Sequence, residues 1–135
     1  MKETVRAIII KDNKLLVFFR RKLKDNKYIT YYAIPGGHVE DGETIEDTVI
    51  RELKEEMNLD IKLIDYLGKI EIYNQIEHYY YAKIIGGELK FGGEELERNS
   101  FDNYYEVRWI DIDEAINSNI SAVDFIKKVV NEYEN

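Results

Sequence analysis

Cysteine is absent from this sequence of 135 residues, and histidine occurs only twice. Without cysteine the chain has no disulfide bonds and no thiolate zinc site, and two histidines are too few for a histidine-based zinc site. Any metal ion that this chain binds must therefore be held by oxygen ligands.

Long apolar runs are also missing, and no stretch approaches the length of a membrane-spanning helix. Residues 1–4 lead directly into a strand pattern, without the apolar segment of a signal peptide. Apolar residues make up 44% of the chain and charged residues 34%, a balance typical of soluble globular proteins. We therefore expect a single cytoplasmic domain over residues 1–135.

Basic residues are outnumbered, with 19 Lys and Arg against 27 Asp and Glu, which gives a net charge of −8. A negative surface opposes binding to duplex nucleic acid or long RNA, whose affinity depends on many cationic contacts. A small phosphorylated substrate is still compatible, because bound divalent cations reverse the charge locally. The expected partner is such a substrate, and a homodimer is left open.

A glycine-containing segment, residues 36–43, leads into the most informative stretch of the sequence. Thr44 suits the N-cap of a helix, and the acids Glu46 and Asp47 suit its first turn. The apolar positions that follow are spaced four residues apart and predict one buried face. They are Ile45, Val49, Leu53 and Met57.

Three glutamates lie at the margin of that buried face: Glu52, Glu55 and Glu56. Burying unpaired carboxylates is costly, so a cation should compensate them. Arg51 alone is outnumbered, and a divalent cation with oxygen ligands, Mg²⁺ or Mn²⁺, is the better explanation. The alternative is a solvated acidic face, but like charges four residues apart destabilise a helix.

These residues resemble the signature of the Nudix (MutT-like) hydrolase family, the Nudix box. The matching positions are Gly37, Glu43, Arg51, Glu52, Leu53, Glu55, Glu56 and Leu59. One position departs, since Asn58 stands where the family has glycine. Asn tolerates the left-handed backbone that this position after a helix requires, so we expect the helix end to be retained.

The resemblance implies an α/β/α sandwich with a mixed central sheet, and an enzyme that cleaves a nucleotide diphosphate linkage. It implies that Glu52, Glu55 and Glu56, with the Gly37 carbonyl, bind Mg²⁺ or Mn²⁺. Glu52 is our preferred general base, Glu55 shares the catalytic site, and Arg51 orients the glutamates. Glu43 is expected to support the loop and the helix rather than to bind metal.

Two further segments are candidates for the site. Arg20 and Lys22 share one face of a predicted strand and either clamp phosphate or form an exposed strand end. In the later loop of residues 92–98, Glu95 is the preferred additional metal ligand, followed by Glu97, and Arg98 is a phosphate contact. The alternative is that this loop is simply an exposed acidic loop.

The remaining pattern predicts a mixture of strands and helices. A hairpin is expected from residues 5–11 and 14–22, and a third strand ends before Pro35, the only proline. This third strand covers residues 28–34, further predicted strands cover residues 61–73, 78–85 and 104–111, and residues 88–91 form a strand or hairpin arm. A short helix is expected over residues 114–117, followed by a final helix capped by Ser121.

The substrate is only weakly specified. The absence of any proline after Pro35 counts against the ADP-ribose type within the family, and no extension of the NADH type is present. Tyr73, Tyr79, Tyr80 and Tyr81 either stack a base or, as is commoner in β-rich proteins, pack internally. Two alternative functions are a catalytically inactive nucleotide-sensing module, which has no need of the full set of acids, and a calcium buffer, which would require an Asp-rich loop that is missing.

Overall fold

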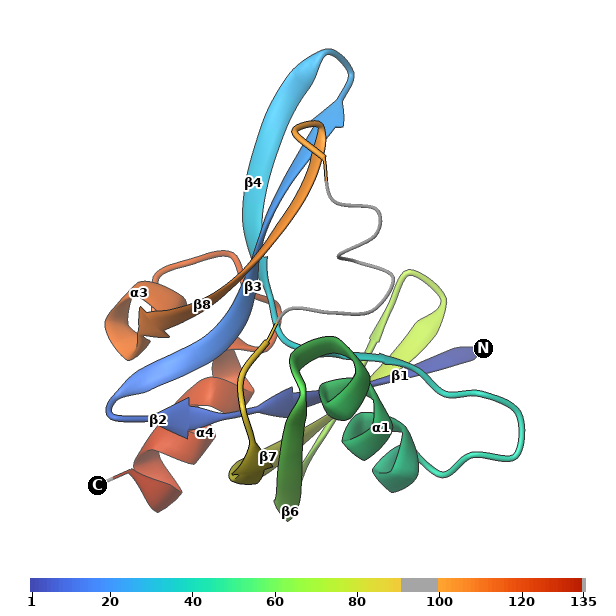
Figure 1. The fold of residues 1–135 in the computed structure, drawn as a ribbon, viewed down its shortest axis with the longest axis vertical. Coiled ribbons are helices and arrows are strands. Elements are labelled where there is room, and N and C mark those ends of the chain that lie inside the picture. The colour runs from blue at the N-terminus through green and yellow to red at the C-terminus, as the bar shows by residue number, and fades with distance from the viewer. Residues whose placement is uncertain (91–99, 135) are drawn as a thin grey trace.

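The computed structural model describes residues 1–90 and 100–134, and its ribbon is shown in Figure 1. Its strands are β1 (Lys2–Ile8), β2 (Ile10–Lys11), β3 (Lys14–Lys24), β4 (Lys27–Ala33), β5 (Gly36–His38), β6 (Leu59–Ile72), β7 (Gln75–Gly87) and β8 (Asn103–Asp111). Its helices are α1 (Ile45–Met57), α3 (Ile112–Ile116) and α4 (Val123–Tyr133). None of the helices in these described ranges is long and apolar enough to cross a membrane.

The strands form two four-stranded sheets. One sheet has the order β5-β1-β7-β6 and is mixed, because β1 and β7 are parallel while the other neighbours are antiparallel. In the other sheet β3 pairs antiparallel with β2, β4 and β8. The far ends of β3, β4 and β8 extend from the body as a twisted arm, seen at the top of Figure 1.

Our prediction of a hairpin between residues 5–11 and 14–22 was correct only at its turn. Ile10 and Lys11 pair with Leu15 and Lys14, but β1 pairs with β5 and β7 in the other sheet. The chain changes sheets at Ile9. A β-rich run that is apolar on both faces does not reveal in the sequence which strands lie beside it.

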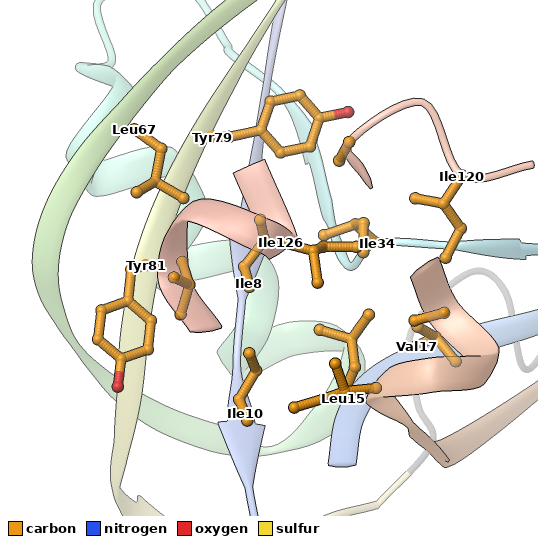
Figure 2. Packing of buried hydrophobic residues seen from close by; sticks show 14 of the residues in the cluster. Ile8, Ile10, Leu15, Val17, Ile34, Leu67, Tyr79, Tyr81, Ile120 and Ile126 are labelled. Carbon is orange, nitrogen blue, oxygen red and sulfur yellow. The ribbon is translucent and has the colours of Figure 1, made fainter. Parts of the chain in front are cut away.

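Two apolar layers confirm the predicted α/β/α arrangement. The first contains Ile8, Leu15, Val17, Tyr79 and Tyr81, and Ile126 of α4 packs into it (Figure 2). The second layer lies on the other side and receives α1 through Val49, Leu53 and Met57, all fully buried. Burying each of these side chains stabilises the fold by about 1.5–3 kcal/mol, so α1 is fixed to the sheet by its apolar stripe.

The ends of α1 confirm the sequence prediction. The Thr44 hydroxyl accepts a hydrogen bond from the Asp47 backbone N–H at 3.1 Å, which caps the first turn. Asn58 ends the helix in the left-handed conformation with φ 58° and ψ 34°. Its backbone N–H points back to the Leu53 and Lys54 carbonyl groups, as in a glycine-type helix end.

Other boundaries differ from the predictions. Gly36 to His38 form β5 on the edge of β1 rather than an irregular loop, and residues 88–90 form no strand. The short helix begins at Ile112, earlier than predicted. Ser121 does not cap the last helix, which begins at Val123 without a side-chain cap. This helix is therefore stabilised by the burial of Ile126 and Val129 rather than by a capping residue at its start.

Candidate active site

The predicted glutamates line a cavity of about 540 Å³ between α1, β5 and the arm. Six of the predicted site residues meet in this cavity: Arg20, Gly37, Arg51, Glu52, Glu55 and Glu56. They come from β3, β5 and α1, so the fold collects into one place residues that are spread over about a quarter of the sequence. Thr4, Arg6, Tyr31 and Tyr105 line it as well.

Gly37 lies against the Glu52 side chain, whose end would have to move to make room for any larger residue. A Cβ atom at position 37 would overlap the Glu52 carboxylate, which occupies the space beside the Gly37 backbone. Gly36 is similarly restricted, because a side chain there would overlap the Val5 carbonyl group on β1. The two glycines therefore let β5 pair with β1 and still leave room for a carboxylate next to the backbone.

Arg51 is the centre of the acidic cluster. Its Nε donates to Glu43 Oε2 at 2.7 Å and its Nη2 donates to Glu43 Oε1 at 3.0 Å, a bidentate pair. Its Nη1 donates to Glu52 at 3.0 Å and to Glu55 at 3.1 Å. One guanidinium group thus contacts three carboxylates, Glu43, Glu52 and Glu55.

Glu43 is fixed on both sides. In addition to Arg51, the Thr48 hydroxyl donates to Glu43 Oε1 at 2.7 Å, and the Glu40 backbone N–H donates to the same oxygen at 3.2 Å. These hydrogen bonds, that from Arg51 first, lower the pKa of Glu43 to about 2 from its ordinary 4.5. The same contacts raise the pKa of Arg51, so this pair is fully charged at neutral pH.

The three predicted metal ligands differ in exposure. Glu56 is buried, with 7% of its surface accessible, and the Glu52 side chain is 14% accessible. The Glu55 side chain is 56% accessible and lies at the mouth. Two carboxylates therefore lie at the edge of the apolar core, as the spacing predicted, and the third faces solvent.

The donor set suits a hard divalent cation, because three glutamates and Gly37 line one cavity and offer only oxygen ligands. Glu52 and Glu55 contact Arg51 instead of converging on one point. In residues 1–90 and 100–134, no three Asp, Glu or His side chains lie close enough together to hold a metal ion. Glu52, Glu55, Glu56 and the Gly37 carbonyl are thus chemically suited to Mg²⁺ or Mn²⁺, and Glu52 and Glu55 would have to turn from Arg51 to share one ion.

Arg20 faces the glutamates from the arm. Its guanidinium carbon lies 3.9 Å from the ring centre of Tyr105 and 5.5 Å from that of Tyr31. Its Nη2 donates to Asn103 Oδ1 at 3.2 Å and to the Tyr105 hydroxyl. Its buried Nε has no hydrogen-bond partner within the described part of the chain. Arg20 also lines the glutamate cavity, and a guanidinium held in a fixed orientation is suited to bind an anion there.

Sequence reasoning missed Tyr31 and Tyr105. They meet Arg20 because β3 pairs with both β4 and β8, which places Arg20 opposite each tyrosine. Tyr105 lies 85 residues away in sequence. Both tyrosines read as ordinary strand residues, and no spacing rule connects them to Arg20.

Lys22 lies apart from the glutamates, although it was predicted to share a site with Arg20. It is exposed and lines a second, larger cavity of about 800 Å³. The two cavities share part of their walls, formed by Arg6, Tyr31, Ala33 and Ile34. Arg6 is fixed in that wall by an ion pair with the buried Glu77 at 3.2 Å.

The other predicted contacts have mixed outcomes. Tyr79, Tyr80 and Tyr81 are buried, so they pack internally, and burial raises the pKa of Tyr79 to about 12. Tyr73 is exposed in the turn between β6 and β7. His38 makes a local contact with the Thr4 hydroxyl at 3.3 Å. Glu95, Glu97 and Arg98 lie outside the described residues.

Comparison with known proteins gives consistent matches. A family model described as NUDIX domain matches residues 1–133. An ADP-ribose pyrophosphatase from Methanocaldococcus jannaschii is 40% identical over 104 residues, which is 73% of this chain. This chain spans only 60% of that relative's length.

Solved structures show the same fold at lower identity. A NUDIX-family hydrolase from Clostridium perfringens matches with a TM-score of 0.70 and 20% identity, over 98% of this chain and 97% of that one. A MutT NUDIX hydrolase from Burkholderia pseudomallei matches with a TM-score of 0.71 and 19% identity, over 94% of this chain and 95% of that one. At these identities the similarity establishes the fold alone.

Proposed function

This chain belongs to the Nudix family, and from that membership we propose that it is a metal-dependent hydrolase of nucleoside diphosphate derivatives or nucleoside triphosphates. The reaction is hydrolysis of the diphosphate linkage, with release of a nucleoside monophosphate. The observation that carries the proposal is the placement of Glu52, Glu55, Glu56 and the Arg20 guanidinium around one cavity. Oxygen ligands for a cation and an anion-binding group are thus adjacent.

Each side chain has a role that follows from its position. Bound Mg²⁺ or Mn²⁺ would be held by the three glutamates and the Gly37 carbonyl, and it supplies positive charge to the phosphate oxygens and makes water more acidic. Glu52, beside Gly37, accepts the proton from the attacking water as general base. Arg51 positions Glu52 and Glu55, and Glu43 positions Arg51.

Arg20 binds the diphosphate from the opposite wall of the cavity. Its place in the cavity wall and its fixed orientation beside Tyr31 and Tyr105 favour a charged oxygen as its partner. The site is acidic apart from its arginines, so this contact and the bound cation together determine where the phosphate groups lie.

The two adjoining cavities favour a substrate with a bulky group beyond the diphosphate. A second space of about 800 Å³ shares Arg6 and Tyr31 with the glutamate cavity, which gives room for a sugar or nucleoside. The lack of proline after Pro35 argued against an ADP-ribose substrate. The relative named ADP-ribose pyrophosphatase, 40% identical over 104 residues, argues for it, and we place ADP-ribose first among the candidates.

A substrate panel tests this proposal. The experiment measures monophosphate release from ADP-ribose, NADH, UDP-sugars and dGTP in the presence of Mg²⁺, of Mn²⁺ and of a chelator. Turnover should require the cation, and Glu56→Gln should abolish it while the circular dichroism spectrum is retained. Removal of a metal ligand or a catalytic carboxylate commonly costs several orders of magnitude in rate.

A matched substitution distinguishes the loss of a catalytic carboxylate from a general loss of negative charge. Glu132 is an exposed acid on α4, so Glu132→Gln changes the net charge by the same amount away from the cavity. This variant should turn over normally. Full activity in Glu56→Gln would contradict the assigned site. Tight nucleotide binding without any product would favour a nucleotide-sensing module instead.

A further inference from the structure

The larger cavity, of about 800 Å³, differs in charge from the glutamate cavity beside it. Among the described residues that line the larger cavity, Glu77 forms an ion pair with Arg6 at 3.2 Å, and Lys22 and Lys24 add two positive charges. The described lining of the glutamate cavity contains four glutamates and three arginines. An acidic space and a basic space therefore adjoin each other in a chain whose net charge is −8.

Arg6, which lines both cavities, is already neutralised. Its Nη1 donates to the Ile34 carbonyl at 2.7 Å, and its Nε donates to Glu77 Oε2 at 3.2 Å. The hydroxyl of the buried Tyr79 donates to Glu77 Oε1 at 3.1 Å, which fixes the carboxylate from its other side. Because Arg6 and Glu77 cancel each other, the positive charge of the larger cavity comes from the two lysines of the arm.

These lysines continue a row of cations that begins at Arg20. Side chains two residues apart point to the same face of a strand, so Arg20, Lys22 and Lys24 share one face of β3. Successive members of the row are separated by about 7 Å along the strand. Arg20 lines the glutamate cavity, whereas both lysines line the larger one. The row therefore leads from the proposed diphosphate site into the space for the group beyond it.

Lys27 adds a like charge at the end of this row. It is paired with Lys24 across the hairpin of β3 and β4, and like charges in opposite positions destabilise a sheet. Residues 20–28 contain five basic side chains and one acidic side chain. A bound anion would offset the repulsion within this group. The local excess of positive charge therefore indicates an anionic ligand at this part of the arm.

We propose that Lys22 and Lys24 bind a phosphate monoester carried by the sugar beyond the diphosphate. This subsite rests on the proposed function, because the diphosphate is taken to lie at Arg20. A phosphate monoester has a charge of about −1.5 to −2 at neutral pH, which two ammonium groups balance. The substrate class is then a nucleoside diphosphate derivative whose sugar is itself phosphorylated. Lys22 binds a phosphate, as its sequence suggested, but a different one from that at Arg20.

Two matched pairs of compounds test this subsite, because the members of each pair differ by one phosphate monoester on a ribose. The pairs are ADP-ribose with ADP-ribose 2′-phosphate, and NADH with NADPH. Titration calorimetry of Glu56→Gln with Mg²⁺ measures their dissociation constants, and wild-type kcat/KM measures their turnover. We expect the phosphorylated member to bind about threefold to tenfold more tightly, because each exposed ion pair contributes modestly. High salt should reduce this preference, because it screens exposed charges.

Two double substitutions in the Glu56→Gln background identify the side chains responsible. Lys22→Gln with Lys24→Gln should bring the ratio of the two dissociation constants to about one in each pair. Lys127→Gln with Lys128→Gln is the matched control, because both lysines are exposed on α4 and neither lines the cavity. This control removes the same charge and should keep the preference. Circular dichroism checks that both variants are folded.

Equal binding of the two members of each pair would overturn the subsite, as would no binding of either member. A preference that survives the loss of Lys22 and Lys24 would overturn it too. The fate of the hydrolase assignment is read separately. If no compound is hydrolysed but the lysines still select the phosphorylated members, the subsite is supported and the reaction is wrong. Turnover without any preference would mean the reverse.

Discussion

Arg51 and Glu43 show how one residue pair supports the acidic cluster. Three negative side chains approach one guanidinium, and such a cluster is stable only when the cation is held firmly. Glu43 holds the guanidinium by accepting two hydrogen bonds from Arg51, and it is itself fixed by a hydrogen bond from the Thr48 hydroxyl. In the proposed mechanism the role of Glu43 is indirect, because it fixes the arginine that contacts Glu52 and Glu55.

The ion pair of Glu43 and Arg51 should make the free energy of unfolding depend on pH. Because the folded protein lowers the pKa of Glu43 to about 2 from 4.5, the carboxylate stabilises the fold above pH 4.5. That contribution is lost as the pH falls from 4.5 through about 2. We expect the wild type to exceed Glu43→Gln in unfolding free energy at pH 6, with the difference shrinking as the pH falls through this window. Urea unfolding at a series of pH values measures it.

The exposed acid Glu132 provides the comparison. Glu132→Gln removes an equal charge without a bidentate partner, so its stability should follow the wild-type pH profile. A Glu43→Gln profile that runs parallel to the wild type from pH 6 down to pH 2 would show that the Arg51 contact contributes nothing to folding.

At the scale of elements, α1 connects the core to the cavity. Its apolar stripe is buried through Val49, Leu53 and Met57, and its glutamates face β5. Both properties depend on the helix ending at Met57, because a longer or shorter helix would redirect the following strand, β6. The position at which α1 ends is therefore as important for the site as the apolar face that α1 buries.

We predict how substitutions of Asn58, the residue that ends α1, change the free energy of unfolding. It adopts φ 58°, and its side-chain amide also donates to the Glu88 carbonyl at 2.9 Å. Asn58→Ala loses this hydrogen bond and leaves the left-handed backbone to a residue without the short polar side chain by which Asn tolerates it, at a position where the Cβ clash costs about 1–2 kcal/mol. Asn58→Gly loses only the hydrogen bond and should be less destabilised. Urea unfolding of the two variants measures the difference, and equal losses would contradict the role assigned to the backbone.

At the scale of the whole molecule, folding brings acids together at a cost. The chain has a net charge of −8, and Glu52, Glu55 and Glu56 lie along one side of a single cavity. Repulsion between carboxylates opposes the compact state, and a divalent cation that binds only the folded chain offsets that repulsion.

Divalent cations should therefore raise the melting temperature. We expect Mg²⁺ or Mn²⁺ at about 100 times its dissociation constant to stabilise the fold by about 2.7 kcal/mol. Calorimetry with and without a chelator measures the shift. Glu56→Gln should abolish most of it, whereas Glu132→Gln should retain it. An equal shift in both variants would indicate a nonspecific ionic effect.

The sequence by itself determined α1 and the chemistry that it carries. Contacts along a helix span only three or four residues, so Thr44, the apolar stripe, Asn58 and the placement of Glu52 and Glu56 could all be inferred from spacing. The oxygen-only donor set followed equally directly from the absence of cysteine and the scarcity of histidine.

Only the tertiary structure decided what lies opposite that helix. The change of sheet at Ile9, the contact of Arg20 with Tyr105 and the second cavity all depend on which strands pair and in which register. Strand partners far apart in sequence are selected by the packing of the whole core, and a one-residue shift would turn each side chain to the other face. No local pattern contains that information.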